Sequence, residues 1–159
     1  MQRSTPLVAA LLWIAAWGCE SAPPPEEQAQ GPGRADSVDI AMKAFDATVF
    51  DTIVWETSNT AIQRGGLVFR ISCAKCHGDL GAGDGNFVAR GDTLRPPSFL
   101  ADDWRFAETP MPLRQYIFSG NVLGMPYWGL VGLGYKDIDA VSRYITENLR
   151  VDSGVIGDD

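Results

Sequence analysis

The sequence predicts a mainly helical fold, because three stretches of the chain carry helical patterns. Apolar side chains recur with helical spacing over residues 60–72 and again over residues 137–149. A third stretch opens with Thr109-Pro110, a cap followed by proline at the first helical position. We therefore expect three core helices.

An export signal is predicted for residues 1–18. One positive charge, Arg3, precedes an apolar run over residues 7–17, and this run is too short to span a bilayer. Residues 16–19 resemble a bacterial lipobox, in which the cysteine, here Cys19, becomes the lipidated first residue of the mature chain. The alternative is cleavage by a general signal peptidase, which leaves Cys19 free or removes it. A lipidated Cys19 would anchor the chain to a membrane.

Residues 19–37 are interpreted as a tether. They contain Pro23-Pro24-Pro25 and Gly31-Pro32-Gly33 with few apolar side chains. Such a segment lets a folded domain move between partners near a membrane, although a featureless spacer has the same composition.

Residues 38–58 combine a helical pattern with residues that favour strands. Ala41 and Phe45 follow helical spacing, whereas Ile53-Val54-Trp55 is rich in strand-forming residues. The apolar content is too high for a solvated tail, so we expect an N-terminal extension that packs on the main domain.

Two helices are predicted on either side of the centre of the chain. Asn59 or Thr60 is the expected cap of the first helix, which runs to about Ser72. Glycine costs about 1 kcal/mol in a helix interior, so the adjacent Gly65 and Gly66 indicate close approach of another backbone. The last helix is expected to begin at a capping Asp137, and its apolar stripe is Ile138, Val141, Tyr144, Ile145 and Leu149.

Cys73-Ala74-Lys75-Cys76-His77 is the strongest chemical signal in the chain. This spacing is the attachment signature of c-type haem, with two thiols for the vinyl groups and His77 as an axial ligand. A redox dithiol is disfavoured because no strand-like run precedes Cys73. A zinc site lacks a fourth Cys or His ligand nearby. A disulfide between Cys73 and Cys76 would leave His77 unexplained.

The composition of the chain argues against several other functions. His77 is the only histidine among the 159 residues, which rules out bis-histidine ligation within the chain and Ser-His or Cys-His catalysis elsewhere. The formal net charge of −7 makes nucleic acid an unfavourable partner. The glycines of residues 78–85 follow the haem motif rather than a strand, so they indicate tight turns and not a nucleotide loop.

Four linked features resemble class I monohaem c-type cytochromes over residues 59–150. They are the Gly65/Phe69 pair, the CxxCH motif, Met125-Pro126 and Tyr144. The resemblance implies an all-α cytochrome c fold with three core helices around one covalently bound haem c. Tyr144 would then cross over the glycine of the first helix.

Met125 is the expected sixth ligand of the iron. Met1 leaves with the signal, Met42 precedes the domain, and Met111 falls in the first turn of a predicted helix. Met125 stands in a loop before the last helix, where the family places its Met-Pro pair. The resemblance further assigns to Pro96 the carbonyl that accepts a hydrogen bond from His77.

These features predict an electron carrier that is not itself an enzyme. We expect a lipid-anchored protein on the periplasmic side of a bacterial membrane that shuttles single electrons between respiratory or photosynthetic protein partners. The alternatives are a fixed cytochrome subunit of a larger membrane redox complex and a haem sensor in which Met125 leaves the iron. Residues 151–159 are interpreted as an acidic tail.

Overall fold

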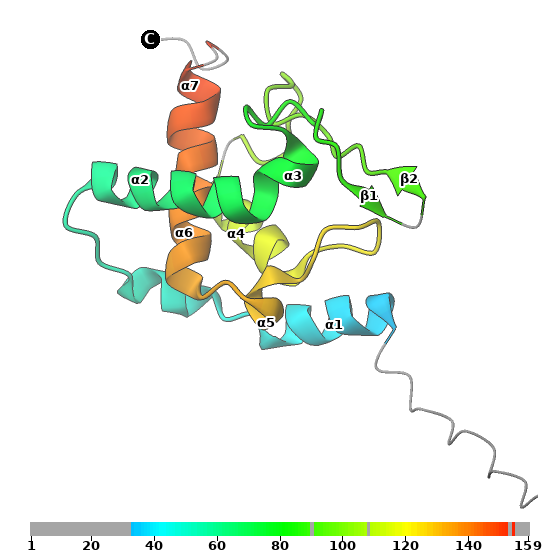
Figure 1. Ribbon diagram of the computed structural model, residues 1–159. Coiled ribbons are helices and arrows are strands. Elements are labelled where there is room, and N and C mark those ends of the chain that lie inside the picture. Colours follow the sequence, from blue (N-terminus) through cyan, green and yellow to red (C-terminus); the bar gives the residue numbers. More distant parts are fainter. Residues whose placement is uncertain (1–32, 90, 108, 153, 155–159) are drawn as a thin grey trace, which may run out of the picture. The chain divides into compact units, whose positions relative to one another are not determined.

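A computed structural model describes residues 33–89, 91–107, 109–152 and 154 (Figure 1). The predicted export signal, Cys19 and most of the tether lie outside these described residues. The elements, in chain order, are α1 (Arg34–Ala44), the 3₁₀-helix η1 (Ala47–Thr52), α2 (Ser58–Val68), the π-helical η2 (Phe69–Cys73), α3 (Ala74–His77), β1 (Val88–Ala89), β2 (Asp92–Thr93), α4 (Pro110–Ser119), α5 (Trp128–Val131), α6 (Tyr135–Arg143), the π-helical η3 (Tyr144–Leu149) and α7 (Arg150–Asp152). The predicted all-α class is confirmed.

Two long helical segments cross at the centre of the fold. One runs through α2, η2 and α3, and the other through α6, η3 and α7 (Figure 1). A Cβ atom added to Gly65 would overlap the carbonyl oxygen of Ala140 and lie 2.7 Å from the Cβ of Tyr144. The ring centroids of Phe69 and Tyr144 are 5.4 Å apart. The close backbone approach predicted from Gly65 is therefore confirmed, and α6 is the partner.

Both predicted caps of these helices were wrong. The N-cap of α2 is Thr57, whose side chain accepts a hydrogen bond from the backbone N–H of Thr60. The N-cap of α6 is Gly134, and α6 begins before Asp137. The Asp137 carboxylate instead accepts two hydrogen bonds from Arg64 on α2, from Nε at 2.7 Å and from Nη2 at 3.0 Å. A local capping pattern cannot reveal a partner 73 residues away.

The helix predicted to start at Thr109-Pro110 is α4, and Gly120 is its C-cap. Leu113, Ile117 and Phe118 of this helix are buried in the core. Gly120 has a positive φ of 64°, a conformation that side-chain-bearing residues rarely adopt. The chain therefore turns sharply into residues 121–127.

The N-terminal extension is helical and contains no strand among the described residues. Its first helix, α1, begins at Arg34, so the last residues assigned to the tether are helical. Phe45 packs edge-on against Phe118 of α4 at 5.4 Å, and Phe50 packs against Tyr135 of α6 at 5.1 Å. The Tyr135 hydroxyl accepts a hydrogen bond from the backbone N–H of Asp46. These contacts join the extension to the helical core.

A buried carboxylate connects three parts of the chain. Asp139 of α6 is 2% exposed and accepts hydrogen bonds from Trp55 Nε1 at 2.8 Å and Arg143 Nε at 3.0 Å. The Arg114 guanidinium of α4 donates a third, short bond to the same carboxylate. Asp139 therefore links the extension to α4 and α6.

The short antiparallel hairpin of β1 and β2 was not predicted. Val88 pairs with Thr93 and Ala89 with Asp92, and Gly91 in the turn has a φ of 90°. Strands of two residues lie below the length at which alternation of side chains is visible in a sequence. Among the described residues, no helix is long and apolar enough to cross a membrane.

Candidate functional site

Cys73 and Cys76 lie on successive turns at the end of the first crossing segment, in η2 and α3. Both thiols are free, with no disulfide between them. Burial raises the pKa of Cys73 to about 12 and also raises the pKa of Cys76. Reactive redox dithiols have lowered pKa values, so these two thiols do not resemble such a pair.

His77 ends α3 with its ring turned into the protein. The ring stacks on Phe99 with centroids 4.5 Å apart, and burial lowers the pKa of His77 to about 4. The imidazole is therefore neutral at neutral pH, the form that binds metals. Its Nδ1 atom is buried without a hydrogen-bond partner among the described residues. A buried polar atom of this kind requires an explanation, and a ligand-binding role for the ring supplies one.

The glycines after His77 form the predicted tight turns. Gly78, Gly81 and Gly83 all have φ between 74° and 80°. The backbone N–H of Gly83 donates to the carbonyl of His77 at 2.8 Å, and a Cβ on Gly83 would overlap the carbonyl oxygen of Pro96. The turns thus bring Pro96 close to the haem motif. No hydrogen bond joins Pro96 to His77 within the described structure, so that role of Pro96 stays a prediction.

One cavity of about 480 Å³ brings together all five residues that the sequence analysis selected. Cofactor sites typically measure about 300–1,000 Å³ and are mostly apolar. The five are Cys73, Cys76, His77, Pro96 and Met125, and they share the cavity with, among others, Leu94, Phe99, Trp104, Leu113, Ile117, Trp128 and Ile145. These side chains come from η2, α3, α4, α5, η3 and the intervening loops.

Met125 is the methionine that reaches this cavity. The described residues include two others, Met42 on α1 and Met111 in the first turn of α4, and neither lines it. Met111 instead packs against the hydrophobic core. The role of Met125 as an iron ligand stays a prediction.

Two arginines line the cavity together with its apolar residues. Arg95 donates to the carbonyl of Gly85 at 2.7 Å. The Arg105 guanidinium lies 4.4 Å from the ring centroid of Phe106 and 4.5 Å from that of Tyr116. Arginine is well suited to bind carboxylates such as the two propionates of haem. Arg105 lies in a loop, and an arginine in a loop carries no periodic signal that the sequence analysis could use.

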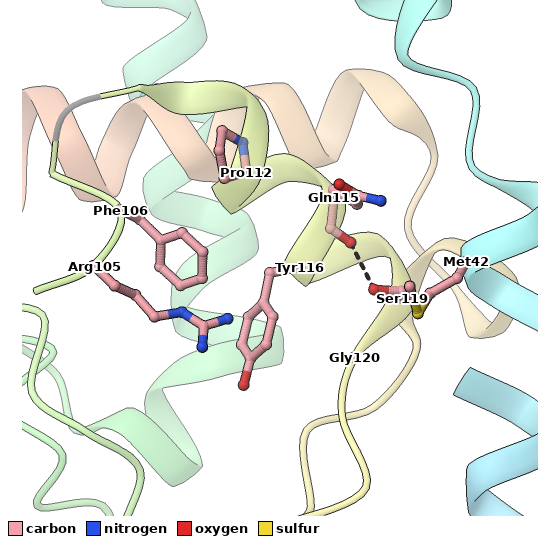
Figure 2. Close-up of a pocket in the computed structure, with 8 residues that line it drawn as sticks. All are labelled: Met42, Arg105, Phe106, Pro112, Gln115, Tyr116, Ser119 and Gly120. Atoms are coloured by element: carbon pink, nitrogen blue, oxygen red, sulfur yellow. Dashed lines mark hydrogen bonds between the residues drawn. The ribbon is translucent and has the colours of Figure 1, made fainter. Parts of the chain in front are cut away.

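Figure 2 shows a second pocket, of about 320 Å³, which is lined by residues of α1, of α4 and of the loop that carries Arg105 and Phe106. The Arg105 guanidinium is directed between the rings of Phe106 and Tyr116 (Figure 2). The hydroxyl of Ser119 donates to the carbonyl of Gln115 at the far side of this pocket. Arg105, Phe106 and Tyr116 line both this pocket and the cofactor cavity.

The donor set fits a covalently bound haem. Two unpaired thiols, a neutral, partly buried imidazole with an unsatisfied buried nitrogen, and a thioether share one mostly apolar cavity. Among the residues that the structure describes, no cluster of three or more His, Cys, Asp or Glu side chains could hold a metal ion directly. A porphyrin that brings four nitrogen ligands needs only the two axial positions from the chain.

A family model described as "Cytochrome C oxidase, cbb3-type, subunit III" matches residues 60–145, which is more than half of the chain. The match begins near the start of α2, includes the CxxCH motif and the Met125 loop, and ends one residue after Tyr144. Searches of curated proteins and of solved structures gave no match.

Proposed function

Because this chain belongs to the cbb3-type cytochrome c oxidase subunit III family, and is thus a c-type cytochrome, we propose that it transfers single electrons through one haem c. The observation that carries this proposal is the shared cavity of Cys73, Cys76, His77 and Met125. When bound, haem supplies a one-electron iron couple. The chain contains a single CxxCH motif, which corresponds to one haem.

Each residue of the site has a distinct role in this proposal. Cys73 and Cys76 would hold the porphyrin through thioether bonds, and the neutral ring of His77 would bind the iron. Met125 would supply the second iron ligand from the chain, which would leave no open position on the metal for small molecules. Arg95 and Arg105 are the cationic partners for the propionates. The apolar lining keeps water out, which lowers the solvent reorganisation that accompanies electron transfer.

Replacement of Met125 by leucine tests this proposal directly. In cells that attach haem to CxxCH motifs, the unaltered protein should carry one haem. Its oxidised form should show the weak charge-transfer band of a methionine–iron bond. The Met125→Leu protein should keep the haem, lose this band, bind carbon monoxide when reduced, and have a lower midpoint potential, because methionine ligation raises the potential.

Met111→Leu is the matched control, because Met111 is also a partly buried methionine and does not line the cavity. This variant should retain the band and the potential of the unaltered protein. An unaltered protein without haem would overturn the proposed function. If both proteins bind haem and the Met125→Leu variant has the same spectrum as the unaltered protein, Met125 is not an iron ligand. That result would overturn the ligand assignment and favour the haem-sensor alternative.

We further propose a location on the periplasmic side of a bacterial membrane, with a lipid on Cys19 and a tether before α1. The sequence pattern of residues 1–19 supports export, and haem is attached to such motifs outside the cytoplasm. The anchor would keep the electron-transfer domain near membrane-bound redox partners.

A second candidate function is that of a fixed subunit in a membrane redox complex, which the family description favours. Purification of the full chain from its native membrane in mild detergent distinguishes the two. A free carrier is expected to elute alone, with its haem. A fixed subunit is expected to co-elute with other redox proteins in constant ratio, and that result would replace the free-carrier proposal.

A further inference from the structure

The loop that carries Met125 is organised by one side chain, that of Asn121. Its Oδ1 atom accepts hydrogen bonds from three backbone N–H groups, those of Leu123 at 2.8 Å, Gly124 at 3.0 Å and Met125 at 3.3 Å. The backbone of Asn121 also donates to the carbonyl of Met125 at 3.1 Å. Asn121 therefore contacts the ligand residue from both its side chain and its backbone.

The amide of Asn121 is itself held in place. Its Nδ2 atom donates to the hydroxyl of Tyr116 on α4, and both residues line the cofactor cavity. An amide bound at its nitrogen and at its oxygen cannot rotate freely. Through Asn121, the three backbone N–H groups of the loop are thus held in a fixed position relative to the core helix α4.

The two ends of the loop also meet. A Cβ on Gly120 would lie 2.5 Å from the carbonyl oxygen of Pro126, so the start and the end of the loop are in close contact. On the outer side, Arg34 of α1 donates to the carbonyls of Asn121 and Met125, at 3.3 and 3.4 Å. The N-terminal extension therefore touches the backbone of the ligand residue.

We propose that Asn121 is a positioning residue that holds Met125 as the sixth ligand, with Arg34 supporting the same loop from outside. This inference rests on the proposed function, because it assumes that Met125 binds the iron. Met125 lies in a loop without helix or strand hydrogen bonds, so its position depends on such side-chain contacts. Without the Asn121 acceptor, the three N–H groups turn to water and the loop gains conformational freedom.

The test compares Asn121→Ala with Asn121→Asp in the haem-loaded full chain. Asn121→Ala should lose most of the methionine–iron charge-transfer band. When reduced, it should bind carbon monoxide at least about tenfold more tightly, which corresponds to about 1.4 kcal/mol. Asn121→Asp keeps an acceptor oxygen at the same position, so it should retain the band. Arg34→Gln should weaken the band less than Asn121→Ala does.

Controls separate a positioning role from a general loss of structure. Asn59→Ala and Arg70→Gln remove the same side-chain types from exposed sites on the α2–η2 segment and should leave the band unchanged. If Asn121→Ala fails to fold, as judged by circular dichroism, Asn121→Gln takes its place. Its longer side chain moves the amide oxygen away from the three N–H groups, so the same loss is expected.

The possible outcomes distinguish the two proposals. A band that is absent from the unaltered protein shows that Met125 is not a ligand and overturns the proposed function together with this inference. If the band is present in the unaltered protein and equally strong in the folded alanine or glutamine variant, only the role of Asn121 is overturned.

Discussion

Replacement of Asp139 by alanine is expected to lower the free energy of unfolding by about 3–5 kcal/mol, the usual cost of removing one partner from a buried ion pair. The Asp139 side chain is 3% exposed and that of its partner Arg114 is 12% exposed. Alanine would leave the Arg114 charge buried without its carboxylate, and Trp55 would lose its hydrogen bond to the same group. Urea unfolding of the haem-loaded protein measures the loss.

Asp137→Ala is the matched control for this prediction. Asp137 lies on the same helix and also pairs with an arginine, but the side chains of Arg64 and Asp137 are 50% and 26% exposed. Solvent-exposed ion pairs contribute about 1 kcal/mol or less, so this variant should remain close to the unaltered protein. Equal losses for Asp137→Ala and Asp139→Ala would contradict the central role assigned to Asp139.

Gly65→Ala is expected to lower the free energy of unfolding by about 3 kcal/mol, at the upper end of the range for overpacking. The added Cβ would overlap the backbone carbonyl of Ala140, and a backbone atom cannot turn aside as a side chain can. The crossing of α2 and α6 would have to open. Denaturant unfolding measures this effect. Haem incorporation should also decrease, because Cys73 and Cys76 lie on the same helical segment as Gly65.

The neighbouring glycine provides the control. A Cβ on Gly66 would lie 3.2 Å from a ring carbon of Tyr144, a contact that a small movement of the ring relieves. Alanine is favoured over glycine by about 1 kcal/mol in a helix, which offsets this contact. Gly66→Ala should therefore have nearly unchanged stability. A similar loss at both positions would show that the crossing does not depend on Gly65 in particular.

Much of the architecture was accessible from local patterns. The stripes on the first and last helices, the Thr109-Pro110 start and the Gly65 contact all correspond to features of the structure. Helix boundaries were less accurate, since Thr57 and Gly134 are the caps instead of Asn59 or Thr60 and Asp137. Several polar residues near a helix start compete for the cap, and packing against other helices decides among them.

The extension shows the limit of such patterns. Its helical spacing and its strand-forming residues pointed in different directions, and the folded chain uses α1 and η1 there. Phe45 and Phe50 pack in a cluster with Phe118 and Tyr135, which come from distant parts of the sequence. Tertiary contacts of this kind override weak local propensity.

By itself, the sequence determined the helical class and the candidate donor set, because the spacing of Cys73, Cys76 and His77 along five consecutive residues is a local property. Tertiary structure alone decided that Met125 shares a cavity with His77 and that Asn121 orders its loop. It also decided that Asp139 joins Trp55 to Arg114. The physical reason is that these side chains meet only after the helices have packed, and the partners in such contacts leave no periodic trace along the chain.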